Sequence, residues 1–167
     1  ILDLVSRINK RSDNYLAECL FKTLGAFKSL KQGNSFYAGQ AVNEFIYEHE
    51  IYDEGVAVVD GSGISRSNEV TVKSLSDLLI EMYKKPEYYE IYKKSLSEAG
   101  VEGTLRRRMK NDFNHTFWGK TGTLNGISSV SGYLEGKNNK CYVISMIFDF
   151  SKKDHAYYKN IQDEIIE

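Results

Sequence analysis

The chain has 167 residues, with 22 basic and 23 acidic side chains, a formal net charge of −1 and 41% hydrophobic residues. This composition excludes disorder of the whole chain, and its length allows a core without disulfide or metal support. The balanced charge argues against nucleic acid as the main partner, and no apolar run approaches the roughly 20 residues that span a bilayer.

The first two thirds of the chain are predicted to be mainly helical. Two segments with apolar residues at helical spacing are separated by Ser12-Asp13-Asn14. Gly25 is interpreted as the C-cap of the second helix. The two glycines of Asp60-Gly61-Ser62-Gly63 predict a fixed loop, and Pro86 marks a break between helices. Helices are predicted at residues 1–10, 15–25, 35–48, 72–83 and 88–96, with one or two helical turns at 105–110.

From His115 onward, β-branched and aromatic residues predominate. Three strands are predicted, at 117–124, 127–134 and 140–150. Asn125-Gly126 predicts a two-residue hairpin between the first two strands, and a helix over 154–166 could cover one sheet face. The sequence therefore predicts an α+β fold that is mainly helical over 1–112, with three antiparallel strands and a final helix over 113–167.

Ser12-Asp13-Asn14 allows two interpretations. Ser, Asp and Asn are preferred N-cap residues, and a helix follows directly. In a turn or an extended loop, however, Ser12 and Asn14 could point together into a cleft, which two residues at this spacing on a helix cannot do.

Lys120-Thr121-Gly122-Thr123 lies inside a predicted strand, where lysine and glycine pack poorly. If the strand is at a sheet edge, an extended peptide could pair with it, and a side chain at Gly122 would obstruct that approach. Lys120 would add a positive charge there, while Thr121 and Thr123 would supply hydroxyl and backbone donors. An exposed lysine beside a turn-prone glycine is the alternative.

A nucleotide-binding interpretation of the same residues fits poorly. Gly119-Lys120-Thr121 matches the end of a phosphate-binding loop, but Asn114 stands where that motif has its first glycine. A hairpin follows the motif instead of a helix whose N-terminus could hold phosphate. Cysteine and histidine spacing predicts no metal site. We interpret Cys19 and Cys141 as buried small hydrophobic residues, with a disulfide as the alternative.

Several motifs, taken in chain order, give the sequence a family resemblance. It resembles the class C low-molecular-mass penicillin-binding proteins, which are serine-type D-alanyl-D-alanine carboxypeptidase/endopeptidases with a β-lactamase/transpeptidase-like fold. The resemblance covers about residues 1–147. The motifs that carry it are Ser12-Asp13-Asn14, Asp60-Gly61-Ser62-Gly63-Ile64-Ser65-Arg66, Gly103-Thr104-Leu105, Lys120-Thr121-Gly122-Thr123-Leu124 and Ser131-Gly132-Tyr133.

The resemblance implies a role for each matching residue. Ser12 would lie on the proton path to the leaving amine, Asn14 would bind the substrate amide, and Lys120 would support proton transfer. Thr121 and Thr123 would hold the terminal carboxylate beside Gly122, and the Thr123 N–H would be one oxyanion donor. No cofactor or metal is implied. The implied partners are peptidoglycan peptides and β-lactams, in the periplasm or cell envelope.

The chain departs from the family pattern at the nucleophile. The family attacks with the serine of an S-x-x-K motif, and no serine here has lysine three residues later. Because the chain begins at Ile1 without methionine, we expect it to be the C-terminal part of a catalytic domain, inactive alone and completed by an upstream segment. The alternatives are a non-catalytic peptidoglycan-binding or interaction module and, less favoured, a nucleotide-binding protein. Carboxypeptidase and endopeptidase specificity stay open.

Three other features are interpreted as structural. Asp60 to Arg66 is expected to be loop architecture beside the cleft. Residues 106–108, all arginine, are interpreted as a solvated helix face. A base-stacking platform is not expected from the tyrosines, which are spaced for helix packing: Tyr83, Tyr88, Tyr89 and Tyr92.

Overall fold

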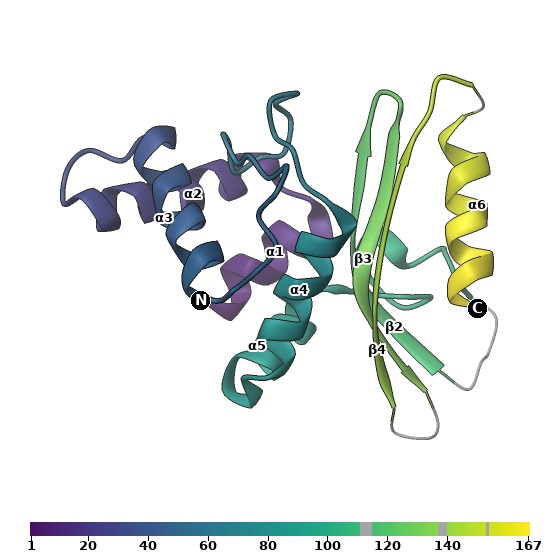
Figure 1. The fold of residues 1–167 in the computed structure, drawn as a ribbon. Coiled ribbons are helices and arrows are strands. Elements are labelled where there is room, and N and C mark those ends of the chain that lie inside the picture. Colours follow the sequence, from purple (N-terminus) through teal and green to yellow (C-terminus); the bar gives the residue numbers. More distant parts are fainter. Residues whose placement is uncertain (111–114, 137–139, 153) are drawn as a thin grey trace. The chain divides into compact units, whose positions relative to one another are not determined.

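The computed structural model describes residues 1–110, 115–136, 140–152 and 154–167. The chain divides into two compact units, one of Ile1–Ser12 with Leu79–Glu167 and one of Asp13–Leu78. Figure 1 shows the elements in chain order: α1 (Leu2–Arg11), α2 (Asn14–Ser29), α3 (Ser35–Glu48), α4 (Val72–Tyr83), α5 (Pro86–Ser95), β1 (Ser97–Glu98), the 3₁₀ turn η1 (Gly103–Leu105), β2 (His115–Leu124), β3 (Ile127–Gly136), β4 (Cys141–Asp149) and α6 (His155–Ile166).

In the unit of residues 13–78, α2 and α3 pack against each other through small residues. The prediction that Gly25 ends the first of these helices is wrong, because α2 continues to Ser29 and its C-cap is Leu30. A Cβ atom on Gly25 would lie 2.6 Å from the Asn34 carbonyl oxygen and 2.8 Å from the Ala38 nitrogen. Gly25 is therefore required by the close approach of the two helices.

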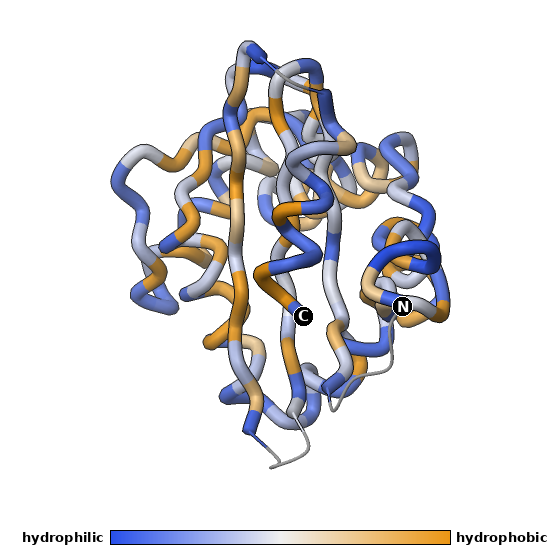
Figure 2. Tube along the Cα trace, turned by 90° about the vertical axis from the view of Figure 1, so that its right-hand side faces the viewer, coloured by the Kyte–Doolittle hydropathy of each residue, from blue (hydrophilic) through white to orange (hydrophobic). Residues whose placement is uncertain are grey.

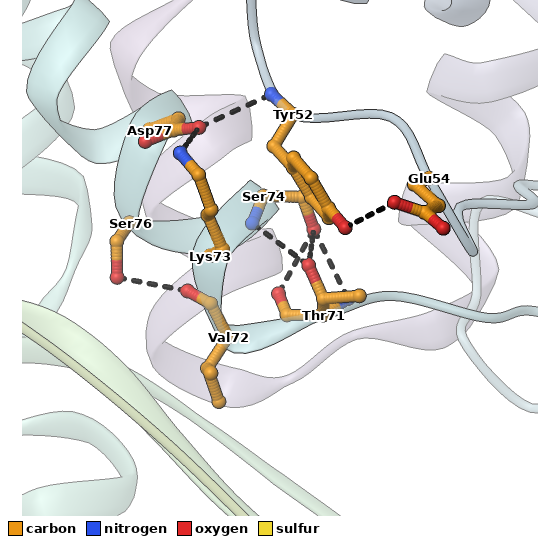
Figure 3. A network of polar contacts seen from close by, with 8 residues as sticks. All are labelled: Tyr52, Glu54, Thr71, Val72, Lys73, Ser74, Ser76 and Asp77. Carbon is orange, nitrogen blue, oxygen red and sulfur yellow. Dashed lines mark hydrogen bonds and ion pairs between the residues drawn. The ribbon is translucent and has the colours of Figure 1, made fainter.

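The start of α4 carries a reciprocal cap, which Figure 3 shows. The Ser74 N–H donates to Thr71 Oγ1 at 3.0 Å, and the Thr71 N–H donates to Ser74 Oγ at 3.1 Å. One turn further, Asp77 Oδ2 accepts from the Tyr52 N–H at 3.1 Å and from Lys73 Nζ at 2.7 Å. These bonds satisfy N–H groups that a helix start leaves without partners, and they tie residue 52 to α4.

Replacing Thr71 with alanine should lower the free energy of unfolding by about 1 kcal/mol, because the Ser74 N–H loses its side-chain acceptor. Chemical denaturation would measure the change. Ser76→Ala is the matched control, since its hydroxyl donates only to the Val72 carbonyl within the same helix. Equal losses in the two variants would contradict the capping role of Thr71.

The sheet is antiparallel and its strands follow the order β1-β2-β3-β4. The three predicted strands are present. The predicted hairpin is also confirmed, because Leu124 pairs with Ile127 across Asn125-Gly126 and Gly126 adopts a φ of +78°. The short strand β1 was not predicted. Its two residues pair with Gly119 and Trp118, and so few residues show no alternating pattern in the sequence.

Each face of the sheet buries its own apolar cluster. The final helix α6 covers one face, as predicted, and hydrophilic and hydrophobic stretches alternate along it in Figure 2. The cluster beneath α6 is formed by Leu105, Phe117, Val130 and Ile166. On the opposite face lie Leu79, Tyr89, Leu96 and Tyr133. Tyr133 has no exposed surface, and its hydroxyl donates to the Leu79 carbonyl at 2.8 Å, so this buried polar group is satisfied.

Three of the four tyrosines that were expected to serve in helix packing make edge-to-face ring contacts. The rings of Tyr89 and Tyr133 meet edge to face at 5.0 Å between centroids, and Tyr92 meets Tyr133 in the same way at 6.4 Å. Tyr83 and Tyr88 are about equally exposed, at 48% and 53%, but Tyr83 contacts the Tyr89 ring at 4.9 Å between centroids. Edge-to-face rings of this kind stabilise a core beyond their buried area.

The predicted helical turns at 105–110 are wrong, because the 3₁₀ turn η1 ends at Leu105 and residues 106–110 are not helical. The prediction of a solvated face is also wrong for Arg108. Its guanidinium donates to Asp163 Oδ1 through Nε at 2.9 Å and through Nη2 at 2.6 Å. Nη2 also donates to Gln162 Oε1 at 3.0 Å and to the Lys159 carbonyl at 3.1 Å. Arg106 and Arg107 are exposed. Arg108 therefore fastens α6 to the segment after η1, a contact across 55 residues of sequence.

A second ion pair joins α5 to β3. Lys93 Nζ and the Tyr89 hydroxyl both donate to Glu135 Oε1 at 2.8 Å, and the ammonium group lies 4.8 Å from the Trp118 ring centroid. Burial alone would raise the pKa of Glu135, but the bonds from Lys93 and Tyr89 outweigh it and hold that pKa below its ordinary value of 4.5.

The lowered pKa of Glu135 predicts an acid-sensitive contribution to stability. A depressed carboxyl pKa stabilises the fold above the unfolded-state pKa, and this stabilisation is lost as the pH falls through the folded-state pKa. We therefore expect Glu135→Gln to lower the thermal midpoint at pH 7, with a difference from wild type that shrinks below about pH 4.5. Thermal unfolding at several pH values would test this. A difference independent of pH would contradict it.

Both cysteines are free. The prediction that both are buried is wrong for Cys19, which is exposed on α2, whereas Cys141 is half-buried beside the Tyr89 cluster. Burial raises the pKa of the Cys141 thiol.

Among the helices of the described residues, none is long and apolar enough to cross a membrane.

Candidate active site

Lys120 and Ser12 meet at the end of α1. Ser12 is the C-cap of that helix and adopts a left-handed conformation with a φ of 54°, which turns the chain sharply after Arg11. Lys120 Nζ donates to Ser12 Oγ at 2.9 Å and to the Thr121 carbonyl at 2.6 Å. Burial lowers the pKa of Lys120, because removal from water disfavours its charged form. A lysine with a lowered pKa, bonded to a hydroxyl, can pass a proton through that hydroxyl.

Beyond Gly119, one edge of β2 is open. β1 pairs with β2 only at Trp118 and Gly119, so Lys120 to Leu124 have a single strand partner, β3, among the described residues. The Ala99 N–H donates to the Phe117 carbonyl at 2.9 Å, which shows that residue 117 directs its backbone polar groups away from β3. Since these groups alternate along a strand, those of Thr121 and Thr123 also face the open edge.

Gly122 leaves its position on β2 without a side chain. Gly122 pairs with Ser129 on β3, and a Cβ atom at 122 would lie 2.4 Å from Ser129 Oγ. Since the Ser129 hydroxyl could rotate away, β3 does not require a glycine here, and the effect of Gly122 is to leave the strand free of a side chain. Thr123, one residue further along, is exposed.

Thr104 belongs to this site, although no role was predicted for it. Thr121 Oγ1 donates to Thr104 Oγ1 at 2.9 Å, and Ser97 Oγ lies 3.2 Å from the same Thr104 oxygen. Gly103-Thr104-Leu105 contributed to the family resemblance, but the residues that Thr104 contacts are 7 and 17 positions away in sequence. Only folding brings these hydroxyls together.

Two of the motifs lie in the unit of residues 13–78. Asn14 is the first residue of α2, and Asp13 caps that helix by accepting from the Leu16 N–H at 3.0 Å. The capping interpretation of this motif therefore holds for Asp13. The functional interpretation of Asn14 stays a prediction, because the structure describes Asn14 and Lys120 in separate units.

The loop after Asp60 is organised around that carboxylate. Asp60 accepts from the Gly63 N–H at 2.6 Å, from the Ser65 N–H at 2.8 Å and from Asn68 Nδ2 at 3.0 Å. Burial would raise the pKa of Asp60, but these bonds outweigh it and lower that pKa. A Cβ atom on Gly61 would meet Phe21 Cβ at 2.4 Å, so Gly61 allows the loop to lie against α2. The predicted fixed loop is present.

The whole chain, residues 1–167, matches the D-Ala-D-Ala carboxypeptidase 3 (S13) family. The chain belongs to this family. It is 29% identical over 157 residues to the D-alanyl-D-alanine carboxypeptidase DacB of Haemophilus influenzae, covering 91% of this chain and 32% of that protein. It is 34% identical over 134 residues to a D-alanyl-D-alanine carboxypeptidase of an Actinomadura species, covering 76% of this chain and 24% of that one.

Solved structures support the fold of this family member. The crystal structure of penicillin binding protein 4 (dacB) from Haemophilus influenzae, complexed with a β-lactam, matches with a TM-score of 0.82 and 23% identity, over 99% of this chain and 41% of that chain. The TLA-1 β-lactamase matches with a TM-score of 0.74 and 19% identity, over 99% of this chain and 61% of that chain. The predicted β-lactamase/transpeptidase-like α+β fold is confirmed. The chain spans a quarter to a third of the curated relatives named here.

Proposed function

We propose that this chain supplies part of the active site of a serine-type D-Ala-D-Ala carboxypeptidase acting on peptidoglycan stem peptides. The observation that carries the proposal is the bond between Lys120 Nζ and Ser12 Oγ, at 2.9 Å, beside the open edge of β2. This bond supports the proposal because an ammonium group and a hydroxyl in contact can transfer a proton, and the neighbouring open strand could receive an extended peptide.

In the proposed reaction, a serine outside this chain attacks the carbonyl carbon of the penultimate D-alanine. The attacking hydroxyl gives its proton to a base, and the bond from that carbon to the terminal D-alanine nitrogen breaks. Ser12 passes a proton to the departing amine and is resupplied through Lys120. Water then hydrolyses the resulting ester, which regenerates the serine. Asn14 is proposed to bind the substrate amide.

The open edge of β2 supplies the proposed binding groups. The Thr123 N–H faces that edge and would donate to the oxyanion that forms in the transition state. The Thr121 and Thr123 hydroxyls would donate to the terminal carboxylate, with Gly122 leaving space between them. The nearby positive charge of Lys120 favours an anionic ligand. β-Lactams, which carry a carboxylate and a reactive carbonyl, are proposed as ligands of the same site.

Acylation of the protein encoded by the whole reading frame that contains this chain would test the proposal. We expect a fluorescent penicillin to label that protein covalently at a serine outside residues 1–167, and Ser12→Ala to slow the labelling strongly. Ser6→Ala is the matched control, because Ser6 lies earlier on α1 and has no part in the proposed chemistry. Binding of peptidoglycan without label would instead support a non-catalytic module. We propose a periplasmic or cell-envelope location, which fractionation would test.

A further inference from the structure

Three hydroxyl groups form a continuous chain that ends at the open edge of β2. Ser97 Oγ lies 3.2 Å from Thr104 Oγ1, and Thr104 Oγ1 lies 2.9 Å from Thr121 Oγ1. Ser97 is completely buried, whereas Thr104 is exposed and Thr121 is half-buried. This chain of hydroxyls therefore connects a buried position, Ser97, to the Thr121 hydroxyl that is proposed to bind the carboxylate.

The hydrogens of this chain determine what Thr121 can offer a ligand. Each hydroxyl donates one hydrogen and can accept two. Ser97 Oγ already accepts the Thr104 N–H at 3.1 Å. Among the residues that the structure describes, the Thr104 hydroxyl is the one acceptor in contact with Ser97 Oγ, and the Ser97 side chain has no exposed surface.

The direction of donation can therefore reverse along the chain. As the structure stands, Thr121 donates to Thr104, which can also accept the Ser97 hydrogen because a hydroxyl accepts two; the exposed Thr104 hydroxyl then gives its own hydrogen to solvent. In the opposite direction, Ser97 donates to Thr104 and Thr104 donates to Thr121. This arrangement also gives the Ser97 hydrogen an acceptor, and it differs in freeing the Thr121 hydrogen for an acceptor outside the three hydroxyls.

Local backbone structure holds Ser97, the buried end of the hydroxyl chain, in place. β1 holds Ser97 against β2 by pairing it with Gly119. Gly103 adopts a φ of +68°, and a Cβ atom there would lie 2.2 Å from Ser97 Oγ and 2.8 Å from Ser97 Cβ. The left-handed glycine thus lets η1 approach β1 closely enough for Thr104 to reach Ser97.

We propose that Ser97 and Thr104 are positioning residues that make the Thr121 hydroxyl a hydrogen-bond donor to the substrate's terminal carboxylate. This inference rests on the proposed function and names the determinant of carboxylate recognition within it. An anionic acceptor at Thr121 favours the arrangement in which Ser97 donates to Thr104 and Thr104 donates to Thr121. The reason is that a charge-assisted hydrogen bond is stronger than a neutral one. The proposal therefore predicts selectivity for ligands with a free carboxylate.

The test compares two acylating agents on the protein encoded by the whole reading frame: benzylpenicillin and its methyl ester, which lacks the anionic carboxylate. We expect Thr104→Val to slow acylation by benzylpenicillin about tenfold, equal to about 1.4 kcal/mol, and to slow acylation by the ester much less. Ser97→Ala should show the same preference in weaker form. Thr104→Ser, which keeps the hydroxyl, should restore the wild-type ratio of the two rates.

The outcomes separate this inference from the proposed function. If wild-type protein is acylated but Thr104→Val slows both agents equally, Thr104 has only a structural role and the inference is overturned. A thermal midpoint close to wild type in Thr104→Val would show that the changed ratio does not come from unfolding. If wild-type protein is not acylated by either agent, the proposed function itself fails, and the inference fails with it.

Discussion

In the protein encoded by the whole reading frame, replacing Lys120 with methionine is expected to slow acylation by penicillin at least about a hundredfold, without lowering the thermal midpoint. Methionine is similar to lysine in length and fills the same half-buried position, but it cannot donate to Ser12 Oγ or carry a proton. Because burial disfavours the charged lysine, its removal relieves a cost of folding. The residue would thus be retained for chemistry at the expense of stability.

Rates of covalent labelling and thermal unfolding, measured on the same preparations, would test this prediction. Lys110→Met is the matched control, because Lys110 is an exposed lysine of the same unit. Labelling by the control should equal that of wild type. A Lys120→Met protein that is labelled at the wild-type rate would remove Lys120 from the proposed proton path.

The effect of Lys120→Met on stability should depend on pH. With its pKa lowered from 10.5, Lys120 binds its proton less tightly in the folded protein than in the unfolded one. Stability of the wild type therefore rises with pH between the folded and unfolded pKa values. The advantage of the methionine variant should be greatest near neutral pH and should shrink as the pH approaches 10.5. A thermal midpoint difference that grows with pH would contradict the sign of the shift.

Arg108→Ala should lower the free energy of unfolding by about 2–3 kcal/mol, the largest stability loss predicted here. Only 12% of the Arg108 side chain and 19% of the Asp163 side chain are exposed, so truncation leaves a carboxylate largely shielded from water without its partner. For a chain of this size, such a loss lowers the thermal midpoint by roughly 5–10 °C. The packing of α6 over Phe117 and Val130 should loosen with it.

Two further variants define the contribution of the guanidinium. Arg107→Ala removes the same charge from an exposed neighbour and should change the midpoint little. Arg108→Lys keeps the charge but cannot form the forked contact to Asp163, so it should recover only part of the stability. A midpoint for Arg108→Ala equal to that for Arg107→Ala would show that the contact contributes nothing.

Local signals in the sequence were sufficient to predict most elements of this fold. Asp154 caps α6 by accepting from the Tyr157 N–H at 3.0 Å, and Asn125-Gly126 forms a two-residue turn, both features that neighbouring residues determine. Gly25 shows where such reasoning fails. Its local signature is that of a helix end, but its reason is the backbone of α3, about ten residues away in the chain.

The candidate site was predictable only in part. Lys120 and Ser12 could be proposed as partners from their motifs, and the structure places them in contact. Thr104 and Ser97 could not, because serine and threonine occur throughout the chain and only β1 and η1 bring these two together. Arg108 was misjudged for the same reason, since its acceptor Asp163 lies on another element.

The outer strand of the sheet has a consequence for handling the protein. β4 is the last strand of the described sheet, and its only strand partner there is β3. From Cys141 to Phe148 it contains no charged residue and no proline, and six of its eight residues are Val, Ile, Met, Phe or Tyr. Such an edge offers unpaired backbone groups to a strand of another molecule. Self-association of residues 1–167 on their own would start at this strand, so dilute samples are required to separate folding from aggregation.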